Sequence, residues 1–238
     1  MKPSRAEQIH RVAVNRILGP LWRRRSAMAP GAHISPIELL PIRPDHIITE
    51  LLRMKLERPE EIGEMIPGST SMIGGILDRR NERFIVAGQL PLACQRFTLA
   101  HELGHFFLHP GLIYHRDLPV IGVERGERGR PPLEEEADRF AAEILIPPRT
   151  LRDVFVVRYR KAISPDEIDE NMAFRLTMGS PASSRLGTIT VDMLVHGKRR
   201  FRSRIIATDT HAGPSLVELF AVSRESMAIQ LEDLDLVF

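Results

Sequence analysis

The chain is poor in the residue that binds metals through sulfur and closes disulfides. Its 238 residues include one cysteine, Cys94. A single cysteine excludes an internal disulfide framework and a multi-cysteine metal site. Any tightly bound metal must therefore rely on His, Asp or Glu side chains.

Long apolar segments are also missing. No uninterrupted apolar run exceeds four residues, whereas a membrane-spanning helix needs about 20. Residues 1–16 lack the apolar core of a secretory signal. We therefore expect a soluble, cytoplasmic protein.

Charge is nearly balanced overall but unevenly distributed. The formal net charge is +2, yet residues 1–30 contain seven Lys or Arg side chains and one acidic residue. A second basic cluster, HGKRRFRSR, covers residues 196–204 and contains no acid. Such clusters attract an acidic protein or nucleic acid, although solvated arms that maintain solubility are the favoured interpretation.

Three segments follow from the pattern of breakers and apolar residues. The Pro- and Gly-containing stretch SAMAPGAHISP predicts that residues 1–36 are a basic N-terminal arm and linker. Residues 37–150 form the expected main domain, and residues 151–238 a mainly helical C-terminal region. The apolar content, 43% of residues, is sufficient for such a core.

The main domain begins with a short helix and continues into strands. We expect a strand near residues 55–57 and a hairpin of two apolar strands around the polar turn 78–82. Two helices should follow, one ending at residues 109–111 and one over 133–146 between two Pro-Pro pairs. The Gly-, Pro- and Arg-rich connection between them has no clear periodicity.

The C-terminal region is predicted to be mainly helical. Residues 163–176 have a helical pattern, while residues 187–208 fit either a hairpin turning at residues 196–197 or a helix. Near the end, two apolar-periodic segments flank AVS, and Ser223 is positioned to cap the second. This end resembles a helix-turn-helix.

The stretch RFTLAHELGHFFLH, residues 96–109, carries the most specific chemistry. On a helix, His101 and His105 share one face and can both bind one zinc ion. Glu102 is rotated away from them, where it can act as general base for a water on the metal. Composition predicts roughly 0.03 such motifs by chance. Gly104 inside this helix suggests close approach of another backbone.

Catalytic zinc usually has three protein ligands, so a third was sought in the helix 133–146. Glu134 shares its face with Asp138 and with small residues that can press on another helix. Glu135 instead pairs with Arg139 as a solvent-facing residue would. We therefore predict Glu134 as the third ligand and Asp138 as the acceptor for the N–H of a zinc-bound histidine.

Taken together, RFTLAHELGHFFLH and the later EEEADRFAAEILIPP resemble the ImmA/IrrE family of zinc metallopeptidases over about residues 40–148. The resemblance implies an α+β fold in which a small zincin-like domain packs a twisted sheet on the HExxH helix. It also implies His101, His105 and Glu134 on Zn²⁺, with Mn²⁺ as the alternative metal, and Glu102 as the catalytic residue. The expected partner and substrate is a helix-turn-helix repressor or antitoxin.

Several features are left open by the sequence. His109 is expected at the surface or as a helix cap, and surface positions are favoured for Tyr114 and His115, although both are chemically suited to stabilise an oxyanion. The strand at residues 84–86 is either an edge to which substrate adds or an ordinary paired strand.

The rival function is a non-catalytic regulatory binding protein with a structural zinc. Three ligands and an adjacent base favour the enzyme, because structural zinc is normally closed by four protein ligands. Acidic residues in the last helical segment argue against direct nucleic acid binding there and favour packing or protein recognition.

Overall fold

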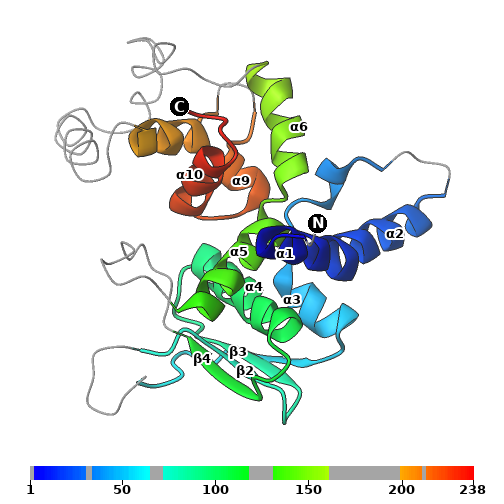
Figure 1. Cartoon of the computed structure of the whole chain (residues 1–238), viewed down its shortest axis with the longest axis vertical. Helices are drawn as coiled ribbons and strands as arrows, with labels where there is room; N and C mark the ends of the chain where they lie inside the picture. Colours follow the sequence, from blue (N-terminus) through cyan, green and yellow to red (C-terminus); the bar gives the residue numbers. More distant parts are fainter. Residues whose placement is uncertain (1–2, 31–33, 65–71, 118–130, 161–198, 211–212) are drawn as a thin grey trace. The chain divides into compact units, whose positions relative to one another are not determined.

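The computed structural model describes the chain except for residues 1–2, 31–33, 65–71, 118–130, 161–198 and 211–212 (Figure 1). The described residues divide into two compact units, residues 1–145 and residues 146–238. The first unit contains a sheet and helices, and the second is mainly helical, which confirms the expected α+β class.

A small four-stranded sheet lies in the first unit. Its order is β1-β3-β2-β4, with β1 parallel to β3 and both other pairs antiparallel. The strands are β1 (Lys55–Glu57), β2 (Gly75–Asp78), β3 (Arg83–Val86) and β4 (Tyr114–Asp117). The predicted strand at 55–57 and the hairpin turning at 78–82 are therefore confirmed.

For the strand at residues 84–86 the structure follows the paired alternative, and it adds one strand that was not predicted. β3 is paired on both sides, so it is not a free edge; among the described strands the ends of the sheet are β1 and β4. β4 itself was not predicted. Its sequence YHRD has no apolar alternation, and the strand forms because it pairs with the fully buried β2.

Two helices, α4 (Leu92–Leu108) and α5 (Pro132–Leu145), pack against each other, and α4 also lies on β2 and β3. α4 ends at His109 as predicted. Gly104 provides the close approach that its position suggested: a Cβ added there would be 2.9 Å from Ala137 Cα. An alanine would not fit without moving α5.

The N-terminal segment differs from the expected arm. Residues 5–28 form a helical stretch made of α1 (Arg5–Ala13), the π-helical turn η1 (Val14–Leu18) and α2 (Gly19–Met28). α1 packs against α5. The reason is an apolar stripe hidden among basic residues, namely the buried side chains Ile9, Ala13 and Ile17 at helical spacing. The chain after α2 continues into a short helix, η2 (Pro36–Leu39).

Another helical pair precedes the sheet, formed by α3 (Pro44–His46) and η3 (Ile47–Leu51). Ile47 and Ile48 are fully buried, and α3 packs against α4. The predicted short helix leading into β1 is thereby confirmed.

The second unit contains α6 (Pro148–Tyr159), a helix over residues 199–208, α9 (Leu216–Phe220) and α10 (Arg224–Asp233). Ser223 caps α10 by accepting a hydrogen bond from the Ser226 backbone, as predicted. Residues 199–208 follow the helical alternative, whereas the hairpin turn at 196–197 and the helix expected over 163–176 lie outside the described residues.

Arginines of the second basic cluster are paired inside this unit. Arg200 forms ion pairs with Glu225 and Glu232 of α10, and Arg204 pairs with Glu225 at 2.5 Å. The acidic residues of α10 and the arginines of residues 199–208 thus neutralise one another. Among the described helices, none combines the length and the apolarity needed to cross a membrane.

Candidate metal centre

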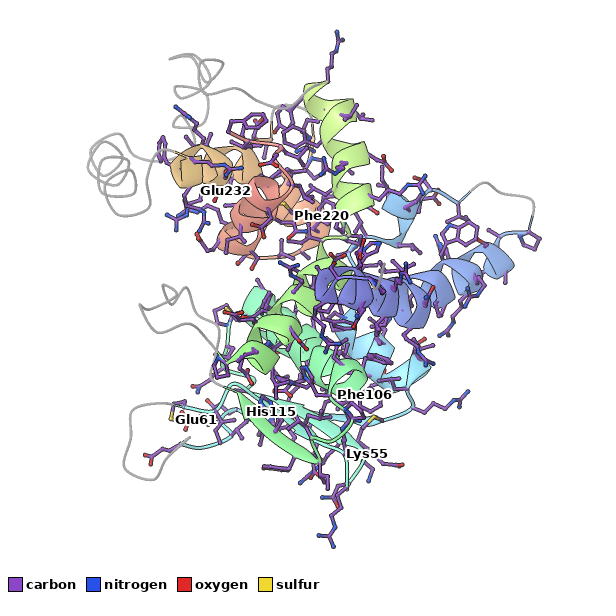
Figure 2. All side chains as sticks on the ribbon, in the orientation of Figure 1. Lys55, Glu61, Phe106, His115, Phe220 and Glu232 are labelled. Atoms are coloured by element: carbon purple, nitrogen blue, oxygen red, sulfur yellow. The ribbon has the colours of Figure 1, made fainter. Side chains whose placement is uncertain are left out.

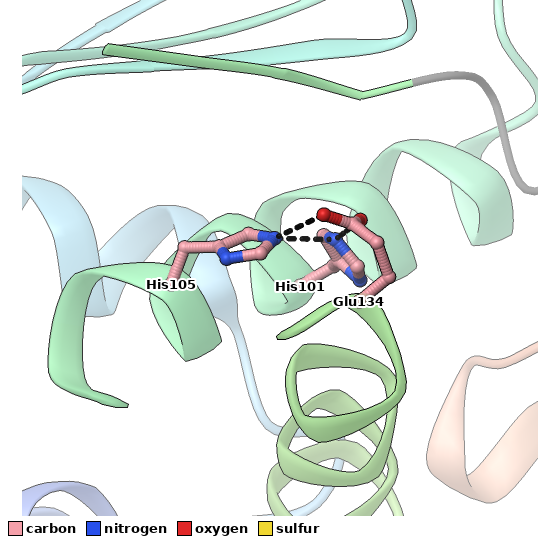
Figure 3. Close-up of side chains that lie close together, drawn as sticks. All are labelled: His101, His105 and Glu134. Atoms are coloured by element: carbon pink, nitrogen blue, oxygen red, sulfur yellow. Dashed lines mark hydrogen bonds and ion pairs between the residues drawn. The ribbon is translucent and has the colours of Figure 1, made fainter. Parts of the chain in front are cut away.

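Two buried histidines of α4 point at one position. His101 and His105 are one helical turn apart, and neither has measurable solvent exposure. Their Nε2 atoms lie 2.9 Å apart (Figure 3). The i, i+4 spacing that the sequence shows therefore becomes a pair of imidazoles with a common target.

Glu134 of α5 reaches the same position (Figure 3). Its Oε2 lies 3.1 Å from His101 Nε2, and its Oε1 lies 3.6 Å from His105 Nε2. The three ligand atoms are all within 4.8 Å of one another. The structure thus brings together the three residues selected from the sequence, although His101 and Glu134 are 33 positions apart in the chain.

The far side of the His101 ring is fixed by Asp138. His101 Nδ1 lies 2.9 Å from Asp138 Oδ1. A carboxylate only accepts, so Nδ1–H donates and the lone pair of the neutral ring is on Nε2, which faces His105 and Glu134. Asp138 is one helical turn after Glu134 on α5 and holds the position that was predicted for it.

The chemistry of the three converging atoms suits a cation. Two imidazole nitrogens and a carboxylate oxygen are acceptor atoms, and gathering acceptors in a buried site is unfavourable unless a cation joins them. Two His and one Glu with room for a further ligand is the donor set of several catalytic zinc sites. These residues therefore fit a zinc ion.

Ionisation of the cluster favours metal binding as well. Burial lowers the pKa of His105 to about 4, which keeps its imidazole neutral at physiological pH. Burial raises the pKa of Glu134, but close contacts with the imidazoles of His101, His105 and His115 outweigh it and lower that pKa overall. A neutral imidazole and an ionised carboxylate are the forms that bind zinc.

Glu102 lies beside this cluster and is itself fully buried. It does not belong to the three-residue group of candidate ligands. β2 approaches it closely, because a Cβ on Gly75 would lie 3.2 Å from Glu102 Oε1 and 2.4 Å from Thr98 Cγ2. The sheet therefore packs on Glu102 next to the three candidate ligands.

His115 of β4 completes the site, although a surface position was favoured from the sequence. Its Nε2 lies 3.1 Å from Glu134 Oε1 and its Nδ1 lies 3.4 Å from Glu102 Oε2. Its ring centroid is 3.8 Å from that of His105. Figure 2 shows the side chain near the sheet. The surface prediction holds for Tyr114, which is 47% exposed.

No local pattern marks His115 as a site residue. It enters because β4 pairs with β2, which places His115 opposite Leu77. Burial lowers the pKa of His115, but the carboxylates of Glu102 and Glu134 outweigh it and raise that pKa to about 9. The residue is therefore a cationic donor at neutral pH.

His109 is the second histidine whose surroundings differ from the surface expectation. It is the C-cap residue of α4, one of the two roles considered for it, but its side chain is buried. Nδ1 lies 2.9 Å from His105 Nδ1, and Nε2 lies 2.9 Å from Glu136 Oε2. A signal for this position was present in the chain, because His109 follows His101 by eight residues and lies near the same helix face.

Comparison with known proteins agrees with this geometry. Residues 69–164 match the family model of the IrrE N-terminal-like domain of peptidase family M78. Metallopeptidase ImmA of Bacillus subtilis (strain 168) is 28% identical over 91 residues, which are 38% of this chain and 50% of that relative. The chain thus spans about half the length of the curated relative it matches. Over residues 69–164 the chain is thus similar to the IrrE N-terminal-like domain of peptidase family M78, and over 91 residues to metallopeptidase ImmA.

Proposed function

We propose that this chain is a zinc-dependent endopeptidase in which His101, His105 and Glu134 hold the metal and Glu102 is the general base. The observation that carries this proposal is the convergence of two buried imidazoles and the partly buried Glu134 carboxylate beside a second, fully buried carboxylate, Glu102. The two-His, one-Glu donor set favours zinc over manganese, which prefers oxygen ligands.

A zinc ion in this site would polarise the scissile carbonyl and lower the pKa of the attacking water. Glu102 then takes the proton from that water at its carboxylate and delivers it to the leaving amine. The Glu102 carboxylate is buried directly against β2, since a Cβ on Gly75 would lie only 3.2 Å from its Oε1, and this packing restricts the side chain.

His115 is proposed to stabilise the oxyanion of the tetrahedral intermediate. Its position between Glu102 and Glu134 supports this role, as does a pKa raised to about 9 by those two carboxylates after burial is offset. To do so, the cationic imidazole gives up its longer contact, the 3.4 Å one with Glu102, and donates that N–H where negative charge develops.

The substrate is proposed to bind as an added strand along β4. β4 lies at one end of the sheet formed by the described strands and carries His115. A peptide that hydrogen-bonds to this edge lies extended beside the metal ligands, which endopeptidase cleavage requires.

The proposed substrate is a helix-turn-helix repressor or antitoxin, and this part rests on the family resemblance. The paired helices α9 and α10 are a candidate surface for recognising it. Direct binding of nucleic acid is a weaker proposal, because Glu225 and Glu232 of α10 already engage Arg200 and Arg204.

Glu102→Gln provides the test of the enzyme. It preserves shape but removes the base, so we expect metal content and unfolding temperature to stay near wild type while cleavage falls by about 10² to 10⁴. Glu135→Gln, an exposed neighbour of the ligand Glu134, is the matched control and should cleave normally. The substrates to test are a helix-turn-helix protein, if one is encoded beside this gene, and unfolded casein.

Each result bears on one part of the proposal. Wild-type cleavage by Glu102→Gln would remove Glu102 as the base. A wild type that binds the partner and metal but cleaves nothing would favour the rival regulatory binding protein with structural zinc. Equal digestion of casein and the partner would indicate a general protease.

A further inference from the structure

A line of hydrogen bonds leads from the metal ligand His105 to the N-terminal helix. His105 Nδ1 contacts His109 Nδ1 at 2.9 Å, and His109 Nε2 contacts Glu136 Oε2 at 2.9 Å. Glu136 in turn accepts hydrogen bonds from Arg5 Nε at 2.7 Å and Arg5 Nη2 at 2.5 Å. These four residues come from the last turn and C-cap of α4, the N-terminal half of α5 and the start of α1.

The protons along this line can be assigned from the chemistry of its ends. The carboxylate of Glu136 only accepts, so His109 Nε2–H donates to it. A neutral His109 then has its lone pair on Nδ1 and accepts from His105 Nδ1–H. His105 consequently presents its Nε2 lone pair to the position shared with His101 Nε2 and Glu134.

Two members of the line, His109 and Arg5, are also held by contacts outside the line. His109 is buried and caps α4, and Arg79 Nη2 donates to its carbonyl at 3.3 Å. Arg5 belongs to a helix whose Ser4–Glu7 capping box sets its first turn. The line therefore connects three helices that pack against one another, α4, α5 and α1.

We propose that His109, Glu136 and Arg5 are positioning residues that hold His105 in its metal-binding tautomer and ring orientation, so that docking of α1 tightens metal binding. The proposal rests on the proposed metal site. Each of the two proposed ligand histidines then has a partner on its Nδ1. Asp138 orients His101, and His109, supported by Glu136 and Arg5, orients His105.

The chain offers a matched control for the effect of α1 docking by itself. His10 of α1 contacts Glu143 of α5 at 2.7 Å, and its side chain is 50% exposed, against 49% for Arg5. Both pairs join α1 to α5 at similar exposure, but only Arg5 continues to a metal ligand. Comparison of Arg5→Ala with His10→Ala therefore distinguishes the effect of the hydrogen-bond line on His105 from the effect of docking α1 on α5.

The first measurement is the dissociation constant for Zn²⁺, by competition with a chelator in the full-length protein. His109→Phe should weaken binding by about 10- to 100-fold, the usual cost of removing the partner of a ligand histidine. His109→Gln should recover part of the loss, since an amide can accept from His105 and donate to Glu136. Arg5→Ala should cost about three- to tenfold, and His10→Ala less than about twofold.

The second measurement detects orientation rather than stability. Proton NMR of the Co²⁺-loaded wild type should show two exchangeable, hyperfine-shifted imidazole N–H resonances, one each from His101 and His105. His109→Phe should remove or broaden one of them and leave the other, which Asp138→Ala should affect instead. If His109 only stabilised the fold, its substitution would not affect one imidazole N–H resonance while leaving the other unchanged.

The outcomes are distinct. Unchanged Zn²⁺ affinity in His109→Phe overturns the line, although the proposed function would stand. Equal losses in Arg5→Ala and His10→Ala overturn the part assigned to Arg5, because docking alone would then explain them. A wild type that binds neither Zn²⁺ nor Co²⁺ overturns this proposal and the proposed function together.

Discussion

Gly104 of α4 lies directly against the backbone of Ala137 of α5. A Cβ on Gly104 would be 2.9 Å from Ala137 Cα and 3.1 Å from its carbonyl oxygen, and neither atom belongs to a flexible side chain. Gly104 immediately precedes one ligand, His105, and Ala137 immediately precedes Asp138. The contact therefore sets how close the two helices bring the histidines to Glu134.

Gly104→Ala should separate these helices and weaken the site. Overpacking costs about 1 to 3 kcal/mol, against a gain of about 1 kcal/mol in helix propensity. We expect lower unfolding stability and weaker Zn²⁺ binding, measured by chemical denaturation and chelator competition. Gly111→Ala is the control, because a Cβ there meets nothing within 4 Å. Wild-type affinity in Gly104→Ala would show that the helix spacing does not limit the site.

Substitution of Glu134, the proposed third ligand, should lower the metal content, whereas substitution of its neighbour Glu135 should not. Glu134→Gln should lose most bound metal after dialysis, because a carboxylate oxygen is replaced by a weaker neutral ligand. Glu135→Gln should retain metal, since that side chain is exposed. Metal analysis of both purified variants decides it. Retention by both variants would mean that Glu134 is not a ligand.

His115→Ala should reduce turnover while metal is retained. Loss of one oxyanion donor typically lowers kcat by about 10² to 10³. Tyr114→Phe is the neighbouring control, and its exposed ring predicts little change. Steady-state kinetics on the cleaved partner, with metal content measured in parallel, tests this. Metal loss in His115→Ala would instead make the residue a ligand.

Arg79 should stabilise the end of the HExxH helix. Its guanidinium donates to the carbonyl oxygens of Leu112 at 2.6 Å, His105 at 3.0 Å and Phe106 at 2.6 Å, and lies over the Phe106 ring. Because charge-assisted hydrogen bonds to carbonyls of the last turn of α4 and of the turn that follows it are lost, Arg79→Ala should cost about 2 to 4 kcal/mol.

The exposed neighbour Arg80 supplies the control for charge alone. Denaturant unfolding of Arg79→Ala and Arg80→Ala measures the difference. If both variants lose the same stability, net charge rather than the cap is responsible.

Acid should weaken the second unit through Glu225. Burial raises the pKa of Glu225, but hydrogen bonds and charges of Arg204 and Arg200 outweigh it, so the folded pKa lies below the ordinary value of 4.5. A lowered folded pKa means that the ionised group stabilises the fold above its unfolded pKa. That stabilisation disappears as pH falls through the folded value.

We therefore expect Glu225→Gln to be less stable than wild type at pH 7, with the difference shrinking below about pH 4.5. Hydrogen exchange of residues 224–233 at several pH values measures it. Asp233→Asn, at an exposed position of the same helix, should show no such convergence. A difference independent of pH would assign the effect to packing.

Local periodicity was sufficient for the elements with strong patterns. The hairpin, the two helices with HExxH and EEEADRF, and the Ser223-capped α10 agree with the structure because caps, turns and apolar spacing act within a few residues. The same reasoning selected His101 with His105 on one helix and Glu134 with Asp138 on another, because helix geometry determines which side chains of a helix share a face.

Other parts depended on contacts between distant segments. The stripe of Ile9, Ala13 and Ile17 was hidden by surrounding arginines, so α1 was expected as a solvated arm rather than a helix packed on α5. β4 has no strand pattern of its own and exists because β2 offers it backbone partners. That pairing also makes β4, and not β3, an end of the described sheet.

The sequence by itself was sufficient to select the three predicted metal ligands and the predicted base, because each was chosen from the spacing within its own helix, α4 or α5. Only the tertiary structure decided what surrounds them. His115 reaches the site through strand pairing, and His109 reaches Arg5 through the packing of α1 on α5. Hydrogen bonds between residues more than a hundred positions apart, such as Arg5 and Glu136, leave no periodic trace in the chain.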